Sequence, residues 1–375
     1  MRLREVELQR LSIPFKGSFG HAASMRSATE PVLVTLHDEQ GRRGVGEALP
    51  RDYVTGETLQ TVIERDGPAL ARELLASALP TMDAVVAWLR EAVSRWDHAL
   101  SAFGAFELAL LDLAGQRHGV ALVDLLGGVQ SPELPAGMVI GFEVATAKLE
   151  RHCAALRFGK RRHIKVKIGA ADDAQRLAII ARVLGPLPLR LDANAAWTAD
   201  EAVARLGALA AVPGLAIASV EQPVGKHDLA GLRRIRTELG LRVMADESVC
   251  SFADAERLVA AQAVDVFNVR LGKMGGALAT ARICEFARRA GIGASLGTMV
   301  GETGVLGRAS ELLGRALAPT AGFDCLDGKG QNAFLLTEDI LEPDADADVH
   351  APGLGVRVSD DRVRAHAVEH HSFRD

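Results

Sequence analysis

The stretch HIKVKIG, from His163 to Gly169, carries two lysines two residues apart within an apolar run that is typical of a β-strand. Because side chains alternate across a strand, Lys165 and Lys167 project from the same face. In an ordinary sheet that face belongs to the core, where unpaired ammonium groups are strongly destabilising. The stretch therefore predicts a strand whose inner face lines a charged site.

Short apolar strands and amphipathic helices alternate on both sides of this stretch. We expect strands at residues 134–142, 163–169, 187–194, 216–223, 241–247, 263–269, 292–298 and 321–326. Helical periodicity lies between them, as at residues 174–184, 199–210 and 276–291. This alternation predicts an α/β fold, namely a modified (β/α)7β barrel of the TIM type. A doubly wound open sheet is the structural alternative, but its glycine-rich phosphate loop is missing after the first strand.

The first part of the chain has a different rhythm. Alternation predicts strands at 6–13 and 31–38 with a hairpin through Gly41, and helical periodicity follows at 59–77, 82–96 and 101–119. We therefore expect an α+β capping domain over residues 1–130 and the barrel over residues 131–344. Residues 352–366 are expected to form a strand by which the tail, residues 345–375, completes the capping domain.

Length and composition exclude several classes of protein. A chain of 375 residues exceeds the usual single domain, and its formal charge of −5 gives no basic excess for nucleic acid. The N-terminus has no apolar core of the kind a secretion signal needs, and no apolar stretch is long enough to span a membrane. We therefore expect neither a secretion signal nor a membrane-spanning helix. The four cysteines form no CxxC pair, which indicates reduced thiols in a cytoplasmic protein.

Acidic residues end three consecutive predicted strands, at Asp192, Glu221 and Asp246. Barrel enzymes place their chemistry at these carboxyl ends, so the three side chains are expected to converge. Carboxylates gathered at low dielectric repel one another, and a divalent cation removes that repulsion. Ligation by oxygen alone indicates Mg²⁺, or Mn²⁺, rather than zinc. Each acid taken alone could instead be a helix N-cap or a surface carboxylate.

Lys273 follows the sixth predicted strand and approaches the same mouth from the wall opposite Lys165 and Lys167. A carboxylate substrate would then have a lysine on each face of its α-carbon, so Lys167 and Lys273 are candidate bases. Lys165 is expected to stabilise the enolate that forms when the α-proton leaves. Taken singly, these lysines could also extend into solvent from an edge strand or a loop.

Three further polar residues lie next to this predicted centre. Asn194 and Glu247 are expected to orient the metal ligands without binding the metal themselves. Glu302 follows the seventh strand, where it either supports the site or caps the next helix.

In this order and spacing, the motifs resemble the enolase superfamily, and within it the muconate-lactonizing (muconate cycloisomerase) subgroup. The motifs are the Lys-x-Lys pair at 165–167, DANAAW at 192–197, EQP at 221–223, ADES at 245–248 and the lysine before a glycine pair at 273–276. The helical segment 101–128 and the C-terminal return extend the resemblance to nearly the whole chain. The resemblance implies a magnesium enzyme in which Lys167 and Lys273 act across one metal ion.

The subgroup includes cycloisomerases, racemases, epimerases and dehydratases, which share this centre. We expect an isomerase of the cycloisomerase or racemase/epimerase type, acting on a small carboxylate. A syn-dehydratase similar to o-succinylbenzoate synthase is the alternative, and a non-catalytic barrel that binds a small acid is a remote third. The Asp-x-Asp marker of dipeptide epimerases is absent in its usual form, because Asp324 and Asp327 are separated by two residues. Arg270 stands where relatives often have lysine.

The resemblance also implies that two loops of the capping domain, Phe15–Arg26 and Leu49–Thr58, close over the barrel mouth. Candidate substrate contacts are His21, Arg26, Arg51, Tyr53, Thr298 and Asp324. Arg26 or Arg51 could hold a distal carboxylate of the substrate by a bidentate pair. Beyond a small carboxylate, the expected partner is a further copy of the chain in a homo-oligomer, and neither nucleic acid nor a membrane.

Overall fold

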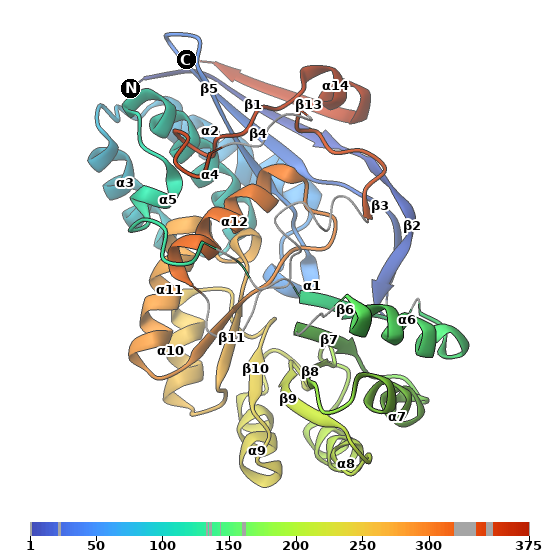
Figure 1. Cartoon of the computed structure of the whole chain (residues 1–375). Coiled ribbons are helices and arrows are strands. Elements are labelled where there is room, and N and C mark those ends of the chain that lie inside the picture. The colour runs from blue at the N-terminus through green and yellow to red at the C-terminus, as the bar shows by residue number, and fades with distance from the viewer. Residues whose placement is uncertain are drawn as a thin grey trace.

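The computed structural model describes residues 2–21, 24–132, 134, 137–142, 144–159, 163–318, 335–342 and 348–374, with the side chains of 18–21, 24 and 25 left out. In these residues an antiparallel sheet with its helices stands beside a curled parallel sheet wrapped by helices (Figure 1). The predicted fold class, an α/β barrel with an α+β capping domain, is confirmed. The expected eighth strand, residues 321–326, lies outside the described residues.

The described part of the parallel sheet has seven strands that neighbour one another in chain order. They are β6 (Gly137–Ile140), β7 (His163–Lys167), β8 (Pro188–Asp192), β9 (Ala216–Glu221), β10 (Val243–Ala245), β11 (Val266–Val269) and β12 (Gly293–Leu296). Lys167 pairs in register with Asp192, and Asp192 with Glu221. The parallel register therefore brings the predicted charged residues to the same edge of the sheet.

Amphipathic helices follow these strands and cover the outer side of the curled sheet (Figure 1). They are α6 (Thr146–Phe158), α7 (Asp173–Leu184), α8 (Ala199–Ala210), α9 (Leu229–Leu239), α10 (Phe252–Ala260), α11 (Ala277–Arg289) and α12 (Gly304–Leu317). In α8, for example, a Thr198–Glu201 capping box starts the helix, and Ala202, Leu206 and Leu209 form its buried stripe. No helix of the described chain is long and apolar enough to cross a membrane.

The capping domain is built on an antiparallel sheet of order β13-β1-β4-β5 in the described residues. Its strands are β1 (Leu3–Leu11), β4 (Val32–Asp38), β5 (Arg43–Ala48) and β13 (Ala367–Arg374). The predicted β4–β5 hairpin is confirmed, and Gly41 takes the left-handed conformation that its turn requires, with φ of 79°. Because β13 pairs with β1, the last residues of the chain lie beside the first (Figure 1).

The prediction that the returning strand lies within residues 352–366 is wrong. That stretch ends in a short helix, α14 (Asp360–His366), and the returning strand is β13, which follows it. Asp360 and Asp361 lie in the first turn of α14, where acidic residues favour a helix start. The alternating exposure along β13 is typical of an edge strand with one face covered.

The capping domain also has several helical segments. They are α1 (Asp52–Thr55), a π-helical turn η1 (Thr61–Asp66), α2 (Gly67–Leu75), α3 (Met82–Arg95), α4 (Leu100–His118) and α5 (Leu122–Leu125). The longest, α4, packs against β5 on one side and against the barrel helix α11 on the other, and it is buried from Leu100 to Gly115. A Cβ at Gly46 of β5 would lie 2.0 Å from the Ala105 carbonyl oxygen, so glycine is what allows α4 to approach β5 so closely.

Within the predicted loop 15–26, the described residues 15–21 and 24–26 belong to two paired antiparallel strands. Strands β2 (Ile13–His21) and β3 (Ser24–Thr29) pair along this segment, with Ile13 opposite Thr29 and Phe19 opposite Arg26. The second predicted loop, Leu49–Thr58, contains the single-turn helix α1, which ends at Gly56 with φ of 82°. The assignment of both segments to the capping domain remains a prediction.

Candidate active site

The inner face of β7 presents the two predicted lysines to the carboxylates of the neighbouring strands. Lys165 Nζ lies 3.3 Å from Asp192 Oδ2 and 3.5 Å from Glu221 Oε1. Lys167 Nζ lies 3.4 Å from the same Asp192 oxygen and donates a hydrogen bond to Asn194 Oδ1. The structure thus brings both ammonium groups to one carboxylate, as the period of the strand predicts.

The three predicted acids end the adjacent strands β8, β9 and the segment after β10, and all are buried. Burial opposes ionisation of Asp192, but the Lys167 and Lys165 ammonium groups hold its pKa below the ordinary value. Burial likewise opposes ionisation of Asp246, whose pKa is nevertheless lowered by Arg270 and Lys273. Burial and the charge of Asp192 raise the pKa of Glu221. The three carboxylates therefore interact electrostatically with one another and with one shared set of cations.

Lys273 reaches this cluster from the strands that follow the three acids in the sheet order. It ends a short 3₁₀ turn, η2 (Leu271–Lys273), that follows β11, and its side chain is 0% exposed. Its Nζ lies 2.8 Å from Asp246 Oδ1 and also donates to the Asp246 carbonyl oxygen. The acids come from β8 to β10, so they lie between the lysines of β7 and Lys273 after β11.

Two arginines and an asparagine join the cluster, and we did not predict them as site residues. Arg190 Nε lies 3.1 Å from Glu221 Oε2, and Asn268 Nδ2 donates to Glu221 Oε1 over 2.6 Å. Arg270 forms an ion pair with Asp246 and lies 3.8 Å from Glu221 Oε1. The signal that could have found them is the period of two: Arg190 precedes Asp192 by two residues, and Asn268 precedes Arg270 by two.

The chemistry of the carboxylates fits a divalent cation, since their oxygens are buried at adjacent strand ends. Among the described residues, however, no three acidic, histidine or cysteine side chains surround one point as metal ligands do. Lys165 contacts both Asp192 and Glu221, and Arg270 contacts both Glu221 and Asp246. Coordination of a metal by all three acids therefore requires these cations to withdraw from the carboxylate oxygens.

Comparison with known proteins places this arrangement in a family. Residues 4–127 match the model of the mandelate racemase/muconate lactonizing enzyme N-terminal domain, and residues 148–362 match that of the enolase C-terminal domain-like family. The chain belongs to the mandelate racemase/muconate lactonizing enzyme family of the enolase superfamily. The resemblance that the motifs predict is thereby confirmed.

Curated relatives in this family include enzymes of two reaction types. The chain is 31% identical to a hydrophobic dipeptide epimerase of Enterococcus faecalis over 307 residues, which cover 81% of this chain and 84% of the relative. It is 30% identical to a chloromuconate cycloisomerase of Cupriavidus pinatubonensis, with 98% of this chain and 99% of the relative covered. A dipeptide epimerase of Cytophaga hutchinsonii, solved with Mg and the dipeptide D-Ala-L-Val, superposes with a TM-score of 0.84 at 25% identity, covering 99% and 100% of the two chains.

The backbone of this enolase-superfamily site turns sharply where its strands end. Asn194, Ala195 and Gln222 all have positive φ, of 47°, 58° and 37°. Gln222 accepts hydrogen bonds from the backbone N–H groups of Asp246 and Ser248. Strained backbone held by such contacts concentrates at functional sites, and here it fixes the residues beside the carboxylates.

Glu247, next to Asp246, is buried at the edge of the same cluster. Burial and the charges of Asp246 and Asp192 raise its pKa to about 8. Its Oε2 has no hydrogen-bond partner among the described residues. Its predicted role in orienting the ligands remains a prediction, as does that of Asn194.

The capping domain places some predicted substrate contacts over the site. Tyr53, in α1, is 45% exposed, and partial desolvation raises the pKa of its hydroxyl. The charges of Arg51, Arg270 and Glu247 also act on that hydroxyl, which therefore faces the cluster. The Arg51 guanidinium is buried and donates to the carbonyl oxygens of Pro50 and Val300. Its hydrogen bond to Val300 joins the α1 segment to the β12–α12 loop of the barrel.

Other predicted contacts are placed less directly. The pKa of Arg51 is lowered mainly by burial and next by the positive charge of Arg26. Arg26 therefore lies near the α1 segment. Thr298, which follows β12 in the chain, is buried. The side chain of His21 and the whole of Asp324 lie outside the described residues.

Glu302 follows Thr298 in the same loop and turns back on it. Its Oε2 accepts a hydrogen bond from the backbone N–H of Met299 over 2.9 Å, and the side chain is buried. The N-cap of α12 is the next residue, Thr303, whose side chain accepts from the Val305 N–H. Of the two predicted roles for Glu302, the direct N-cap belongs to Thr303.

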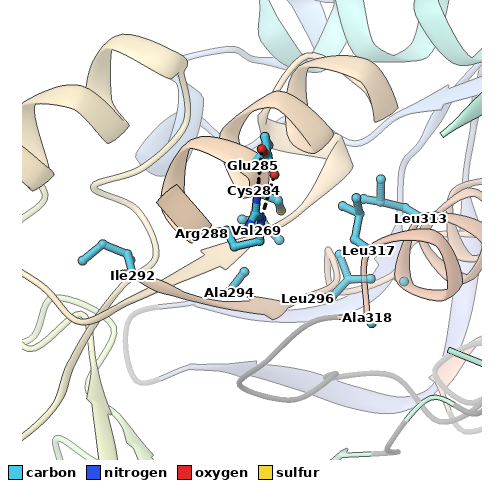
Figure 2. A pocket seen from close by; sticks show the side chains of 11 residues that line it. Val269, Cys284, Glu285, Arg288, Ile292, Ala294, Leu296, Leu313, Leu317 and Ala318 are labelled. Carbon is cyan, nitrogen blue, oxygen red and sulfur yellow. Dashed lines mark hydrogen bonds and ion pairs between the residues drawn. The ribbon is translucent and has the colours of Figure 1, made fainter. Parts of the chain in front are cut away.

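Two cavities lie near the barrel. One, of about 340 Å³, is lined by α1, the β9–α9 loop and the β10–α10 loop, and it reaches Glu247. The other, of about 120 Å³, lies between α11, α12 and the outer side of β11 and β12 (Figure 2). Val269 lines this second cavity, whereas its neighbours Asn268 and Arg270 point to the carboxylates, so the second cavity is separate from the charged centre.

Proposed function

We propose that the protein is a Mg²⁺-dependent isomerase that removes a proton from the carbon next to a substrate carboxylate and returns a proton to the same molecule. The observation that carries this proposal is the placement of Lys167 and Lys273 on opposite sides of the three carboxylates. A substrate bound at the carboxylates would present one face to each lysine. Two amines on opposite faces are the arrangement that proton transfer across a planar carbon needs.

The charge of the centre supports an anionic substrate. Its carboxylates, from Asp192, Glu221 and Asp246, contact a larger set of cations in the described structure. These cations are Lys165, Lys167, Arg190, Arg270 and Lys273. A buried excess of positive charge favours a carboxylate, and it favours still more the second negative charge that develops when the α-proton leaves.

The steps at the lysines follow from their contacts. As a neutral amine, Lys167 or Lys273 takes the α-proton from its own face, and the opposite lysine, as an ammonium group, returns a proton to the other face. Lys165 stays close to the developing charge and stabilises it. Asn194 orients Lys167 by accepting its hydrogen bond, and the Asp246 carbonyl orients Lys273. Mg²⁺ held by Asp192, Glu221 and Asp246 would supply Lewis-acid stabilisation of the substrate carboxylate.

The relatives support two forms of this chemistry. An epimerase returns the proton to the same carbon. A cycloisomerase, such as the chloromuconate enzyme, isomerises its substrate by closing or opening a ring. The crystal structure of a relative with Mg and a dipeptide supports the metal and a small acid substrate. Epimerisation or racemisation uses both lysines, and it is therefore the form that the paired geometry favours. Syn-dehydration, the alternative, needs a base on one face only.

The test is proton exchange in D₂O with Mg²⁺. We expect that a panel of N-acylamino acids, dipeptides, muconates and sugar acids contains a substrate that gains deuterium at its α-carbon, observed by NMR. Unchanged mass apart from deuterium indicates an isomerase, whereas loss of water indicates the dehydratase. If calorimetry shows that Mg²⁺ and a carboxylate bind but no member of the panel exchanges, the proposal is contradicted in favour of a binding protein.

A further inference from the structure

Helix α4 of the capping domain lies against the segment of the barrel that carries Lys273. A Cβ at Gly104 of α4 would lie 2.9 Å from the backbone nitrogen of Gly276, so the two backbones are in direct contact. From the next turn of α4, Glu107 reaches the start of α11. Its Oε2 accepts from the Ala277 N–H over 3.0 Å, and its Oε1 accepts from the Leu278 N–H over 2.8 Å. The Glu107 carboxylate thus caps a barrel helix from another domain.

This contact lies only a few residues from the candidate base. Between Lys273 and Ala277 the chain passes through Gly275 and Gly276, which have φ of 78° and 95°. A Cβ at Gly276 would come within 2.3 Å of Glu107 Oε2, so the carboxylate fills the space beside that turn. The connection is short and packed, so we expect a displacement of the α11 N-terminus to reach Lys273.

The two candidate bases differ in what holds their backbone. Lys167 lies within β7, where the sheet fixes its register against Asp192 of β8. Lys273 lies beyond the end of β11, in the turn η2, where no sheet pairing of the described strands includes it. Its backbone position therefore depends on what packs against η2 and the following glycines. Met299 and Leu306 lie against Gly272 within η2, and α4 lies against the glycine turn that follows Lys273.

Glu107 is well placed to supply that support. It is 1% exposed, and each oxygen takes one N–H of the helix terminus. Hydrogen bonds to a buried carboxylate are stronger than those between neutral groups. Burial raises the pKa of Glu107 to about 7, against the effect of these two hydrogen bonds. The helix terminus, the glycine turn and the carboxylate are thus parts of one rigid contact.

We propose that Glu107 is a positioning residue for Lys273, holding this base at its face of the substrate while leaving Lys167 unaffected. The inference rests on the proposed function for the role of Lys273, and it goes further by assigning a part of the capping domain to one of the two proton transfers. A merely structural role would weaken both transfers equally.

The test compares exchange at the two faces. With a substrate available in both configurations, Glu107→Gln is expected to slow deuterium uptake from the configuration that Lys273 deprotonates by 10- to 100-fold, a range typical of a misplaced catalytic group. Uptake from the configuration that Lys167 deprotonates is expected to change by less than about threefold, as for a substitution that does not touch the reacting groups. Lys273→Ala identifies which configuration belongs to which lysine. Equal losses from both faces would overturn the proposal.

Glu47 supplies a matched control. It also lies in the capping domain and is buried, and its carboxylate accepts from the N–H groups of Thr303 and Leu306 at the start of α12. Glu47→Gln therefore removes a comparable contact between domains, but at α12, whose Leu306 side chain lies beside Gly272 rather than at the glycine turn that follows Lys273. We expect it to affect both faces to the same extent. A face-selective loss in Glu47→Gln equal to that in Glu107→Gln would contradict the assignment.

A measurement without substrate separates this inference from the proposed function. Trace labelling with acetic anhydride, read by mass spectrometry, reports the reactivity of Lys273 relative to Lys167 in the folded protein. We expect Glu107→Gln to raise this ratio severalfold, because Lys273 is fully buried in the native contact, and Glu107→Asp to raise it less. If the wild type exchanges no substrate, the proposed function fails, while an unchanged labelling ratio in folded Glu107→Gln overturns the positioning role itself.

Discussion

Arg270 and Asp246 form a buried ion pair at the carboxyl ends of adjacent strands, and the same guanidinium lies 3.8 Å from Glu221 Oε1. This pair places a positive charge between two of the carboxylates that we propose as metal ligands. It is consistent with the requirement that metal coordination displaces a cation. It also makes the metal affinity of this chain sensitive to a residue that is not itself a ligand.

We therefore expect Arg270→Gln to bind Mg²⁺ about tenfold more tightly than the wild type. The change removes a hydrogen bond to a charged group, which is worth about 1.5–3 kcal/mol and competes with the metal for Asp246. Arg270→Lys keeps the charge and is expected to stay close to the wild type. Calorimetric titration with Mg²⁺ measures the affinities, and weaker binding by Arg270→Gln would show that the guanidinium supports the metal site.

Binding of Mg²⁺ should stabilise the fold through the three carboxylates. At a metal concentration of about 100 Kd, we expect the free energy of unfolding to rise by about 2.7 kcal/mol. The gain should disappear in Asp192→Asn, Glu221→Gln and Asp246→Asn. Asp200→Asn, which changes an exposed acid of α8, serves as the control and should keep the gain. Denaturation with and without Mg²⁺ measures these differences, and a full gain in any of the three ligand variants would remove that residue from the metal site.

The charged centre was predictable because two rules act on short stretches of sequence. Alternation placed Lys165 and Lys167 on one face, and the parallel register brought Asp192 and Glu221 to one edge. The partners of Arg190 were not predictable in this way. Arg190 donates to Ser295 Oγ over 3.0 Å across the barrel, a contact between residues 105 positions apart. Such a contact depends on how far the sheet curls, which the local pattern does not encode.

The contacts between domains were also beyond the sequence pattern. Glu107 lies on a helix that the periodicity predicts, but its role at the start of α11 depends on how two domains dock. Arg51 was predicted as a substrate contact because it lies in a segment over the barrel mouth. The structure shows that its guanidinium holds Val300 of the barrel, 249 positions away. Docking of this kind follows from tertiary packing of long-range elements.

The Arg51 contact gives a separate prediction. Because Arg51 joins the α1 segment to the β12–α12 loop, Arg51→Ala is expected to raise KM severalfold for every substrate that the enzyme accepts. Steady-state kinetics on matched substrates with and without a distal carboxylate measures this effect. If only substrates with a distal carboxylate lose affinity, Arg51 binds that carboxylate and does not act as a link between the two segments.

Buried carboxyl groups between the domains predict how stability depends on pH. Burial raises the pKa of Glu47 and Glu107 to about 7 and that of Asp112 to about 6. In each case the folded chain keeps a proton that the unfolded chain releases at lower pH. The stability from this effect is fully present below the ordinary carboxyl pKa and is lost as the pH rises through the raised values.

We therefore expect these groups to lower the free energy of unfolding between pH 5 and pH 8. Urea denaturation across this range measures the slope. Glu47→Gln and Glu107→Gln should each flatten it, because a glutamine does not titrate. A slope that is identical in wild type and both variants would show that these carboxyl groups keep the same pKa in the folded and unfolded chains.

The most direct test of the central claim measures deuterium uptake at the α-carbon in Lys167→Ala and Lys273→Ala, starting from each configuration of one substrate. The two-sided arrangement of these lysines around the carboxylates predicts that each variant loses uptake from one configuration, and that the two variants lose opposite ones. Uptake from both configurations in either variant would contradict the account, since it would show that the remaining lysine reaches both faces or that neither is the base.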